Sequence, residues 1–218
     1  MNNMKIWPAV FLASWMLIAA DVITVFGYRW TLPAASDWKI EEQGNESVLR
    51  LIAPRGPLPG PRRPIQFSLA ETPEFRRVTV DLDARPLDHS LIVVFAYRDA
   101  AHFNYAHLSI DPATKEHVHN GVFHVYGGER VRISSEAGPA AFPASNRWYH
   151  VRLTHDGESG TVGVMVDGRS IPALHAIDLS LGSGRVGIGS FDETGDFKNV
   201  KIDGVPISNE AAHLETPH

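Results

Sequence analysis

Histidine and tyrosine side chains gather in one short part of the sequence, where they could do chemistry together. Five histidines lie between residues 102 and 124, with Tyr105 and Tyr126 close by. In an extended strand every second side chain points to the same face. Tyr105 and His107 therefore share one face of a first strand, and Asn120, His124 and Tyr126 share one face of the next. If these two strands pair, we expect all five of these side chains to form a single patch.

Such a patch could bind a sugar or act on one. Tyrosine rings stack on apolar sugar faces, while histidine, asparagine and arginine hydrogen-bond the hydroxyl groups. For catalysis, a histidine would be the general base and a tyrosine the general acid of a β-elimination from a uronic acid or a 3-keto sugar. A neighbouring Arg98, Arg130 or Arg132 would neutralise the carboxylate or the developing enolate. The predicted ligand-binding residues are Arg98, Tyr105, His107, Asn120, His124, Tyr126 and Arg132, and the catalytic candidates are Tyr105, His107, His124 and Tyr126.

Metal binding is the third chemistry that the sequence leaves open. His117 and His119 stand two residues apart, so on a strand they would point the same way and could share a zinc-type ion. Residues 192–196 read Asp-Glu-Thr-Gly-Asp, and several carboxylates around a glycine suit calcium. We predict Asp192 and Asp196 as calcium ligands, with Asp37 as a possible further ligand. The alternatives are histidines that are merely solvated on a sheet surface and an ordinary acidic turn.

The elements that must position these residues are short strands. From residue 38 onward the apolar side chains alternate with period two, most clearly over residues 75–84. Gly127-Gly128, Asp156-Gly157, Asp167-Gly168 and Asp203-Gly204 are tight-turn signals between such runs. This pattern predicts an all-β sandwich of two antiparallel sheets. The other strands are expected at residues 47–52, 65–69, 90–98, 103–110, 117–126, 129–134, 148–155, 161–166, 185–191 and 197–202.

Two segments interrupt the strand pattern. Residues 54–64 contain five prolines, which lack the amide donor that a central strand needs, so we expect an exposed, stiff loop there. Residues 135–146 are rich in alanine, proline and serine and predict a second loop.

Composition narrows the classes of partner. The 218 residues are 44% hydrophobic and 21% charged, which is enough apolar material for one sizeable core. The net charge is −5 with mixed signs, so no basic field exists to hold nucleic acid. There is no cysteine, which excludes disulfides, thiolate chemistry and cysteine-based zinc sites.

The first residues predict export. Lys5 precedes an apolar run over residues 9–20, which is typical of a secretory signal. An uncleaved membrane anchor is the alternative, although Asp21 would then lie within the spanning segment. We therefore expect a signal peptide or anchor over residues 1–27, a connector over 28–37, the β-domain over 38–207 and a polar tail over 208–218. The protein would be secreted or periplasmic, or membrane-anchored if the N-terminal segment is retained.

Several stretches resemble one superfamily of bacterial extracytoplasmic domains. They are Ile-Val-Val-Phe-Ala-Tyr-Arg-Asp at 92–99, His-Phe-Asn-Tyr-Ala-His-Leu at 102–108, Arg-Trp-Tyr-His-Val-Arg-Leu at 147–153, Val-Gly-Val-Met-Val-Asp-Gly at 162–168, and the Gly-Arg-Val-Gly-Ile-Gly-Ser-Phe-Asp segment that opens 184–200. Together they resemble concanavalin A-like lectin/glucanase domains, in particular the laminin-G-like domains and the relatives of the 3-keto-disaccharide hydrolases. The Asn-Gly-Lys-Asp-Leu-x-Gly-Trp opening of those hydrolases and the Glu-x-Asp-x-x-Glu motif of laminarinase-type enzymes are absent.

This resemblance implies a jelly-roll sandwich with a glycan in the concave groove of one sheet, and it adds weight to a structural calcium. It does not imply one activity, because the fold hosts lectins, hydrolases, lyases and interaction modules. Our first hypothesis is an extracytoplasmic module that binds a polysaccharide or oligosaccharide. The alternatives are a glycan-active enzyme, either a polysaccharide lyase or a 3-keto-glycoside hydrolase, and a laminin-G-like module that binds protein.

Overall fold

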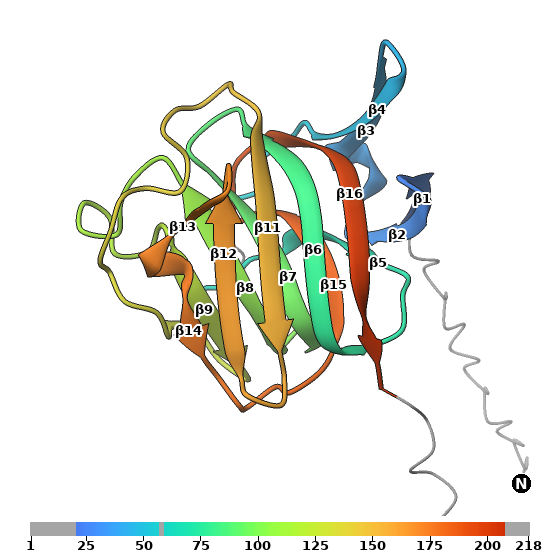
Figure 1. Ribbon diagram of the computed structural model, residues 1–218. Coiled ribbons are helices and arrows are strands. Elements are labelled where there is room, and N and C mark those ends of the chain that lie inside the picture. Colours follow the sequence, from blue (N-terminus) through green and yellow to red (C-terminus); the bar gives the residue numbers. More distant parts are fainter. Residues whose placement is uncertain (1–20, 57–58, 208–218) are drawn as a thin grey trace, which may run out of the picture.

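The protein consists of two antiparallel β-sheets packed face to face, as the computed structural model shows for residues 21–56 and 59–207 (Figure 1). Sheet A has the strand order β1-β2-β5-β15-β7-β8-β9-β10, and sheet B has the order β13-β12-β11-β6-β16-β4-β3, with β14 paired to β12. The predicted all-β, two-sheet sandwich is therefore confirmed. The strands of sheet A are β1 (Asp21–Val25), β2 (Tyr28–Leu32), β5 (Gln66–Ala70), β15 (Arg185–Ser190), β7 (Ser90–Asp99), β8 (His102–Ser109), β9 (Gly121–Tyr126) and β10 (Arg130–Arg132). Those of sheet B are β13 (Arg169–Ser170), β12 (Thr161–Val166), β11 (Tyr149–Asp156), β6 (Phe75–Pro86), β16 (Gly195–Pro206), β4 (Glu46–Leu51), β3 (Trp38–Gln43) and β14 (Ala176–Ile177).

Sheet B follows the alternation that its sequence predicts. In β6, Val80 and Leu82 are buried against sheet A, while Asp81 and the other outward residues face solvent. Its neighbour β11 alternates in the same way, and Arg152 pairs with Asp81 across the two strands at 2.8 Å. One face of this sheet is apolar and the other is charged, as expected for an antiparallel sheet with water on one side.

Sheet A is apolar on both faces. Residues 90–96 of β7 are all buried, so this strand has no solvent-facing side. Its inward side chains join the main core between the sheets, and its outward ones join a second cluster on the outer face. We call this second cluster the aromatic layer; it consists of Phe67, Leu69, Ile92, Val94, Phe103, Tyr105, Phe123 and Val125.

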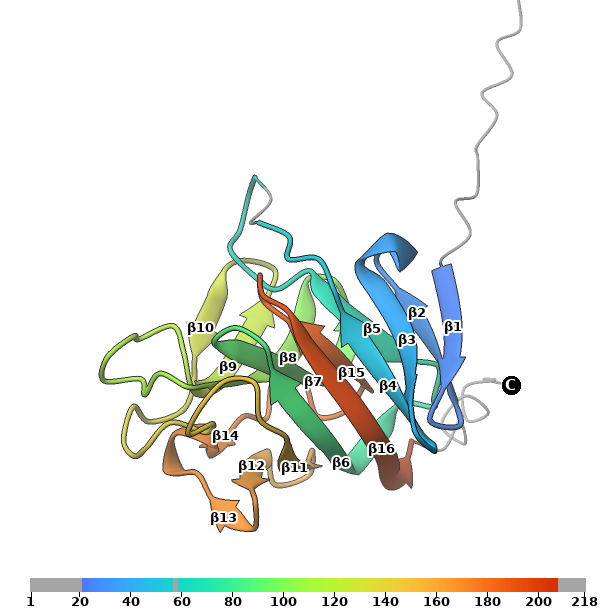
Figure 2. The same cartoon turned by 90° about the horizontal axis from the view of Figure 1, so that it is seen from above.

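The predicted connector over residues 28–37 is wrong, because this stretch is part of the fold. Strands β1 and β2 form a hairpin at the edge of sheet A, and Trp30 is fully buried with its indole N–H donating to the Val25 carbonyl at 3.1 Å. The Tyr28 hydroxyl accepts a hydrogen bond from the Ile202 amide at 3.0 Å, which links this hairpin to sheet B. The hairpin lies beside β3 and β4 at one end of the sandwich (Figure 2).

Residues 1–20 and 208–218, which hold most of the predicted signal and the predicted tail, lie outside the described residues. No helix in the described part is long and apolar enough to cross a membrane.

The proline-rich segment contains no strand in its described residues, 54–56 and 59–64, and its side chains are mostly exposed. It is nevertheless fixed at both ends. Arg55 is paired with the buried Asp37, and the Arg62 carbonyl accepts a hydrogen bond from the Arg130 amide at 3.1 Å. Figure 2 shows this loop rising beside β10. The second contact brings Arg62 to the outer face of sheet A.

The buried side chain of His155 is expected to destabilise the protein. His155 lies in the core against Phe95, and neither of its ring nitrogens has a hydrogen-bond partner within the described part of the chain. We expect His155→Leu to raise the free energy of unfolding by about 1 kcal/mol, because it removes buried polar atoms that lack partners. Urea denaturation measures this. His107→Leu is the matched control and should destabilise the protein by about 1–3 kcal/mol, since both nitrogens of His107 have partners. A destabilised His155→Leu protein would contradict the prediction.

Candidate functional site

The five predicted patch residues do not share one face of sheet A. In the pairing of β8 with β9, Tyr105 lies opposite Phe123, and Asn104 lies opposite His124. Residues directly opposite each other in an antiparallel pair share a face. Tyr105 therefore belongs to the outer face with Phe123, whereas His124 lies on the inward side near the sheet edge. The expectation of one continuous patch is wrong, because alternation within each strand does not fix the register between strands.

His124 and Tyr126 form a separate cluster at the edge of the sandwich. The His124 Nδ1 lies 2.8 Å from the Asn104 Oδ1 and 3.2 Å from the Asp178 Oδ2. The ring of Tyr126 stacks on His124 with centroids 5.4 Å apart and is 60% exposed. This edge presents an aromatic face with a histidine and a carboxylate behind it, but it contains neither Tyr105 nor His107.

Asn120 and Arg132 hold a turn together. Strand β9 begins only at Gly121, so His117 and His119 lie in the preceding turn and not on a strand. Asn120 is buried with a φ of 45°, donates to the Pro139 carbonyl and accepts from the Ala141 amide. Arg132 donates to the carbonyls of His117, His119 and Asn120. Its guanidinium fills the space that a side chain at residue 121 would need.

The predicted zinc-type pair does not share an ion site. His117 contacts Glu136 at 2.9 Å, and His119 contacts Ser109 at 3.2 Å. Arg98, the remaining predicted ligand-binding residue, is exposed at the end of β7 and donates to the Ser183 carbonyl at 3.4 Å. It lies on the same sheet as the aromatic layer but is not among the residues that line a hollow there.

The aromatic layer covers the outer face of sheet A with a continuous series of rings. Tyr97, Phe67 and Phe103 have centroids 5.4–5.9 Å apart, and Phe103 leads on to Tyr105, which stacks on Phe123 at 5.2 Å. Gly187 and Gly189 of β15 leave the room for this, since a Cβ at either position would collide with β5. The absence of a side chain at these two glycines therefore leaves space for Phe67 and Leu69 of β5.

A hollow of about 400 Å³ opens at the Tyr97 end of this layer. Strands β2, β5 and β7 and the proline-rich loop contribute its walls. The lining includes Leu32, Pro33, Arg63, Phe67, Leu69 and Tyr97. Tyr97 is only half-buried, and burial raises the pKa of its phenol, so the hydroxyl stays protonated at neutral pH. The hollow therefore combines an aromatic wall with a hydroxyl and a guanidinium.

Two arginines cap the opposite end of the layer. The guanidinium carbon of Arg130 lies 4.1 Å from the centre of the Phe191 ring, and that of Arg62 lies 5.2 Å from the same centre. Cations over an aromatic face are attracted by its negative quadrupole. Sequence reasoning missed Arg62 and Phe191. The paired arginines in the proline-rich loop were the one local signal that could have indicated the former.

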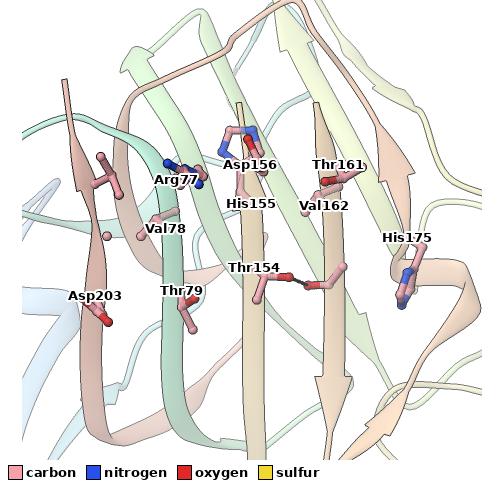
Figure 3. Close-up of a pocket in the computed structure, with 13 residues that line it drawn as sticks. Arg77, Val78, Thr79, Thr154, His155, Asp156, Thr161, Val162, His175 and Asp203 are labelled. Atoms are coloured by element: carbon pink, nitrogen blue, oxygen red, sulfur yellow. Dashed lines mark hydrogen bonds between the residues drawn. The ribbon is translucent and has the colours of Figure 1, made fainter. Parts of the chain in front are cut away.

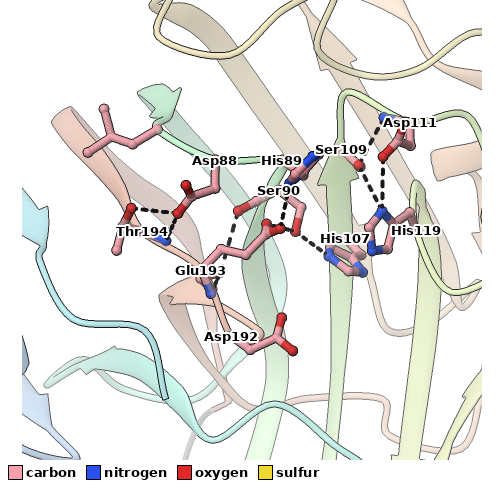
Figure 4. A network of polar contacts seen from close by, with 12 residues as sticks. Asp88, His89, Ser90, His107, Ser109, Asp111, His119, Asp192, Glu193 and Thr194 are labelled. Atoms are coloured by element: carbon pink, nitrogen blue, oxygen red, sulfur yellow. Dashed lines mark hydrogen bonds and ion pairs between the residues drawn. The ribbon is translucent and has the colours of Figure 1, made fainter. Parts of the chain in front are cut away.

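A polar network runs beside this cap and joins β7, β8 and the loop after β15 (Figure 4). Ser90 donates to the Glu193 Oε2 at 2.5 Å, and its Oγ lies 2.7 Å from the His107 Nε2. The His107 Nδ1 lies 2.9 Å from the Val118 carbonyl. A serine between a carboxylate and a histidine could in principle relay a proton. However, Ser90 is 1% exposed and His107 is 2% exposed, so no substrate atom reaches them as a general base requires.

The acidic loop is not arranged as a calcium site. Asp196 is fully buried between two arginines, with the Arg50 Nε at 2.6 Å and the Arg85 Nε at 2.8 Å from its oxygens. Asp192 lies 3.8 Å from Arg62, and Asp37 is paired with Arg55 elsewhere. No group of three or more candidate ligands converges among the described residues. The predicted Asp192–Asp196 site is therefore wrong, because guanidinium groups already neutralise the carboxylate that it needs.

A second hollow of about 590 Å³ lies on the outer face of sheet B (Figure 3). Thr79, Thr154 and Thr161 line it from β6, β11 and β12, and His175 closes one side. It is shallow, and the described rings of the aromatic layer lie on the other sheet. The outer face of sheet A therefore remains the stronger candidate for ligand binding.

Comparison with known proteins defines the class of fold. No protein-family model matches the sequence, and no curated protein matches it significantly. Among solved structures, the carbohydrate-binding module CBM66 from Bacillus subtilis superposes with a TM-score of 0.56 and 18% identity, over 80% of this chain and 95% of that chain. A candidate glycosyl hydrolase from Parabacteroides distasonis gives 0.52 and 14%, over 81% and 99%. A mutant of the GH43 protein BlXynB from Bacillus licheniformis gives 0.55 and 12%, over 85% of this chain and 38% of that chain.

Identities this low establish the fold alone. The chain is an all-β, two-sheet antiparallel jelly-roll sandwich, the fold that the sequence resemblance implied.

Burial of His107 predicts a loss of stability in acid. Burial, with the nearby His119 and Arg130, lowers the pKa of His107 to about 3. An unfolded chain would protonate this ring near pH 6.5, so between pH 6.5 and 3 the unfolded state binds the extra proton. The free energy of unfolding should therefore fall as the pH drops through this window, by a few kcal/mol in all.

Urea denaturation between pH 4 and 7 tests this, with His107→Gln showing a shallower decline than the parent protein. His175→Gln, on the other sheet, controls for the loss of a histidine. Equal slopes in the parent and His107→Gln proteins would contradict the assignment.

Proposed function

We propose that this chain is a carbohydrate-binding module that holds a glycan against the outer face of sheet A. The observation that carries the proposal is the hollow of about 400 Å³ where Tyr97 and Phe67 meet Arg63. An aromatic ring packs on the apolar face of a sugar, and the phenol and guanidinium can hydrogen-bond its hydroxyl groups. A site of this kind is mostly apolar with a few convergent polar groups, as small-ligand sites usually are.

The fold is compatible with this function. One structural neighbour is a carbohydrate-binding module, and another is a candidate glycosyl hydrolase. Binding without turnover is favoured over catalysis because the two most acid-base-like residues of this face, His107 and Ser90, are buried. His124, another of the four predicted catalytic residues, lies on the opposite side of the sheet. We further propose that the protein works in the periplasm or outside the cell, which rests on the sequence of residues 1–20.

A glycan array followed by titration calorimetry tests the proposal. We expect Tyr97→Ala to weaken binding of the best glycan about tenfold, because the stacking surface is lost. Tyr126→Ala is the matched control, since Tyr126 is an exposed tyrosine of the separate His124 cluster. The affinity of the Tyr126→Ala protein for the same glycan should equal that of the parent protein.

The opposite result would place the site at the His124 edge. Product analysis accompanies the titration: an unsaturated, ultraviolet-absorbing product would favour a lyase. Absence of any glycan signal would contradict the proposal and favour a protein-interaction module.

A further inference from the structure

Within the described residues, the arginine cap has less counter-charge than the two arginines that meet on sheet B. Arg130 and Arg62 both lie over Phe191. Within residues 21–56 and 59–207, Arg130 forms no ion pair, and the carboxylate paired with Arg62 is Asp192 at 3.8 Å. Two guanidinium groups on one ring repel each other, and an anion between them would relieve that repulsion.

Sheet B shows how the same chain satisfies two converging arginines. Arg50 and Arg85 meet at the fully buried carboxylate of Asp196, each with an Nε within 2.8 Å of an oxygen. Charge-assisted hydrogen bonds of this kind are the strong ones in proteins. Two guanidinium groups also lie close to the Phe191 ring, and there the described residues supply one ion pair, from Arg62 to Asp192 at 3.8 Å.

A buried hydroxyl beneath the cap also lacks a partner. Tyr105 is fully buried, and its phenol oxygen has no hydrogen-bond partner in the described part of the chain. Burial raises the pKa of this phenol, so it is a hydrogen-bond donor at neutral pH, and the cationic groups that act on it are Arg130, Arg132 and Arg62. Because Tyr105 is sealed from solvent, its hydroxyl belongs to the surroundings of the arginine cap and does not itself contact a ligand. Arg132 itself is occupied by backbone carbonyls.

We propose that the glycan is acidic, and that Arg130 and Arg62 bind a carboxylate or sulfate group of the sugar. This inference rests on the proposed function, because it assumes that the outer face of sheet A binds the glycan. A uronic acid and a sulfate ester present the same chemistry here, namely a multidentate anion that two guanidinium forks can clamp.

Affinity for a matched pair of ligands tests the inference. Calorimetry is performed with an oligogalacturonate and with its fully methyl-esterified form, which keeps the sugar and removes the charge. A sulfated and an unsulfated chondroitin oligosaccharide form the second pair. We expect the charged member of at least one pair to bind about tenfold more tightly, with an affinity that falls as salt rises. The pair that responds identifies the anion.

Variants then locate the charge. Arg130→Gln and Arg62→Gln should each abolish the advantage of the charged ligand, whereas Arg130→Lys should retain part of it. Arg152→Gln, an arginine on the outer face of sheet B, is the charge-matched control and should change nothing. The exposed Arg62 provides a second variant in case Arg130→Gln disturbs folding.

Three negative outcomes are distinguishable. If neutral glycans bind in a Tyr97-dependent manner and the charged members bind no better, the acidic specificity is wrong and the proposed function stands. If charged ligands bind equally well to the Arg130→Gln and Arg62→Gln proteins, the cap is not their site. If neither charged nor neutral glycans bind, the proposed function fails, and this inference fails with it.

Discussion

Burial of strand β7 on both faces is the constraint on which the rest of the structure depends. Its inward residues, Val93 and Phe95, fill the space between the sheets, and its outward residues, Ile92 and Val94, belong to the aromatic layer. In most antiparallel sandwiches the outer face of a sheet is solvated. Here the outer face is itself hydrophobic, so other segments must cover it. The proline-rich loop, Phe191 and the arginine side chains of β10 cover it.

On the outer face of sheet A, the residues that pack together and the residues that a ligand could reach occupy different places. Residues at the centre of the outer face, such as Tyr105 and His107, are sealed from solvent and serve mainly to support their neighbours. Residues at its two ends, Tyr97 beside the hollow and Arg62 at the cap, are at least partly accessible. The proposed binding groups therefore lie on strands or on loops fixed by contacts, which would reduce the entropy lost when a ligand is held.

The sequence predicts the strands well where one side of a strand meets water. Strand β6 and strand β11 alternate so clearly that their positions and buried faces follow from period two. The hairpin of β1 and β2 was missed because its first strand continues the apolar character of the residues before it. The face of His124 was also misplaced, since alternation sorts the residues within one strand and leaves the register with the next strand open. The arginine cap brings together residues 62, 130 and 191. These residues are far apart in the sequence, so a local sequence pattern cannot predict that they are in contact.

The net charge of the protein and the local charge of the arginine cap would have opposite effects on an acidic ligand. The whole chain carries a net charge of −5, so an acidic polysaccharide is weakly repelled at long range and gains nothing from non-specific attraction. At contact, the local cations dominate, because screening by salt limits the distant charges to about a Debye length, roughly 8 Å under physiological conditions. An anion held between Arg130 and Arg62 over Phe191 would lie within that distance of both guanidinium groups. Selectivity for an acidic sugar would therefore come from the geometry of the cap and not from the overall field of the protein.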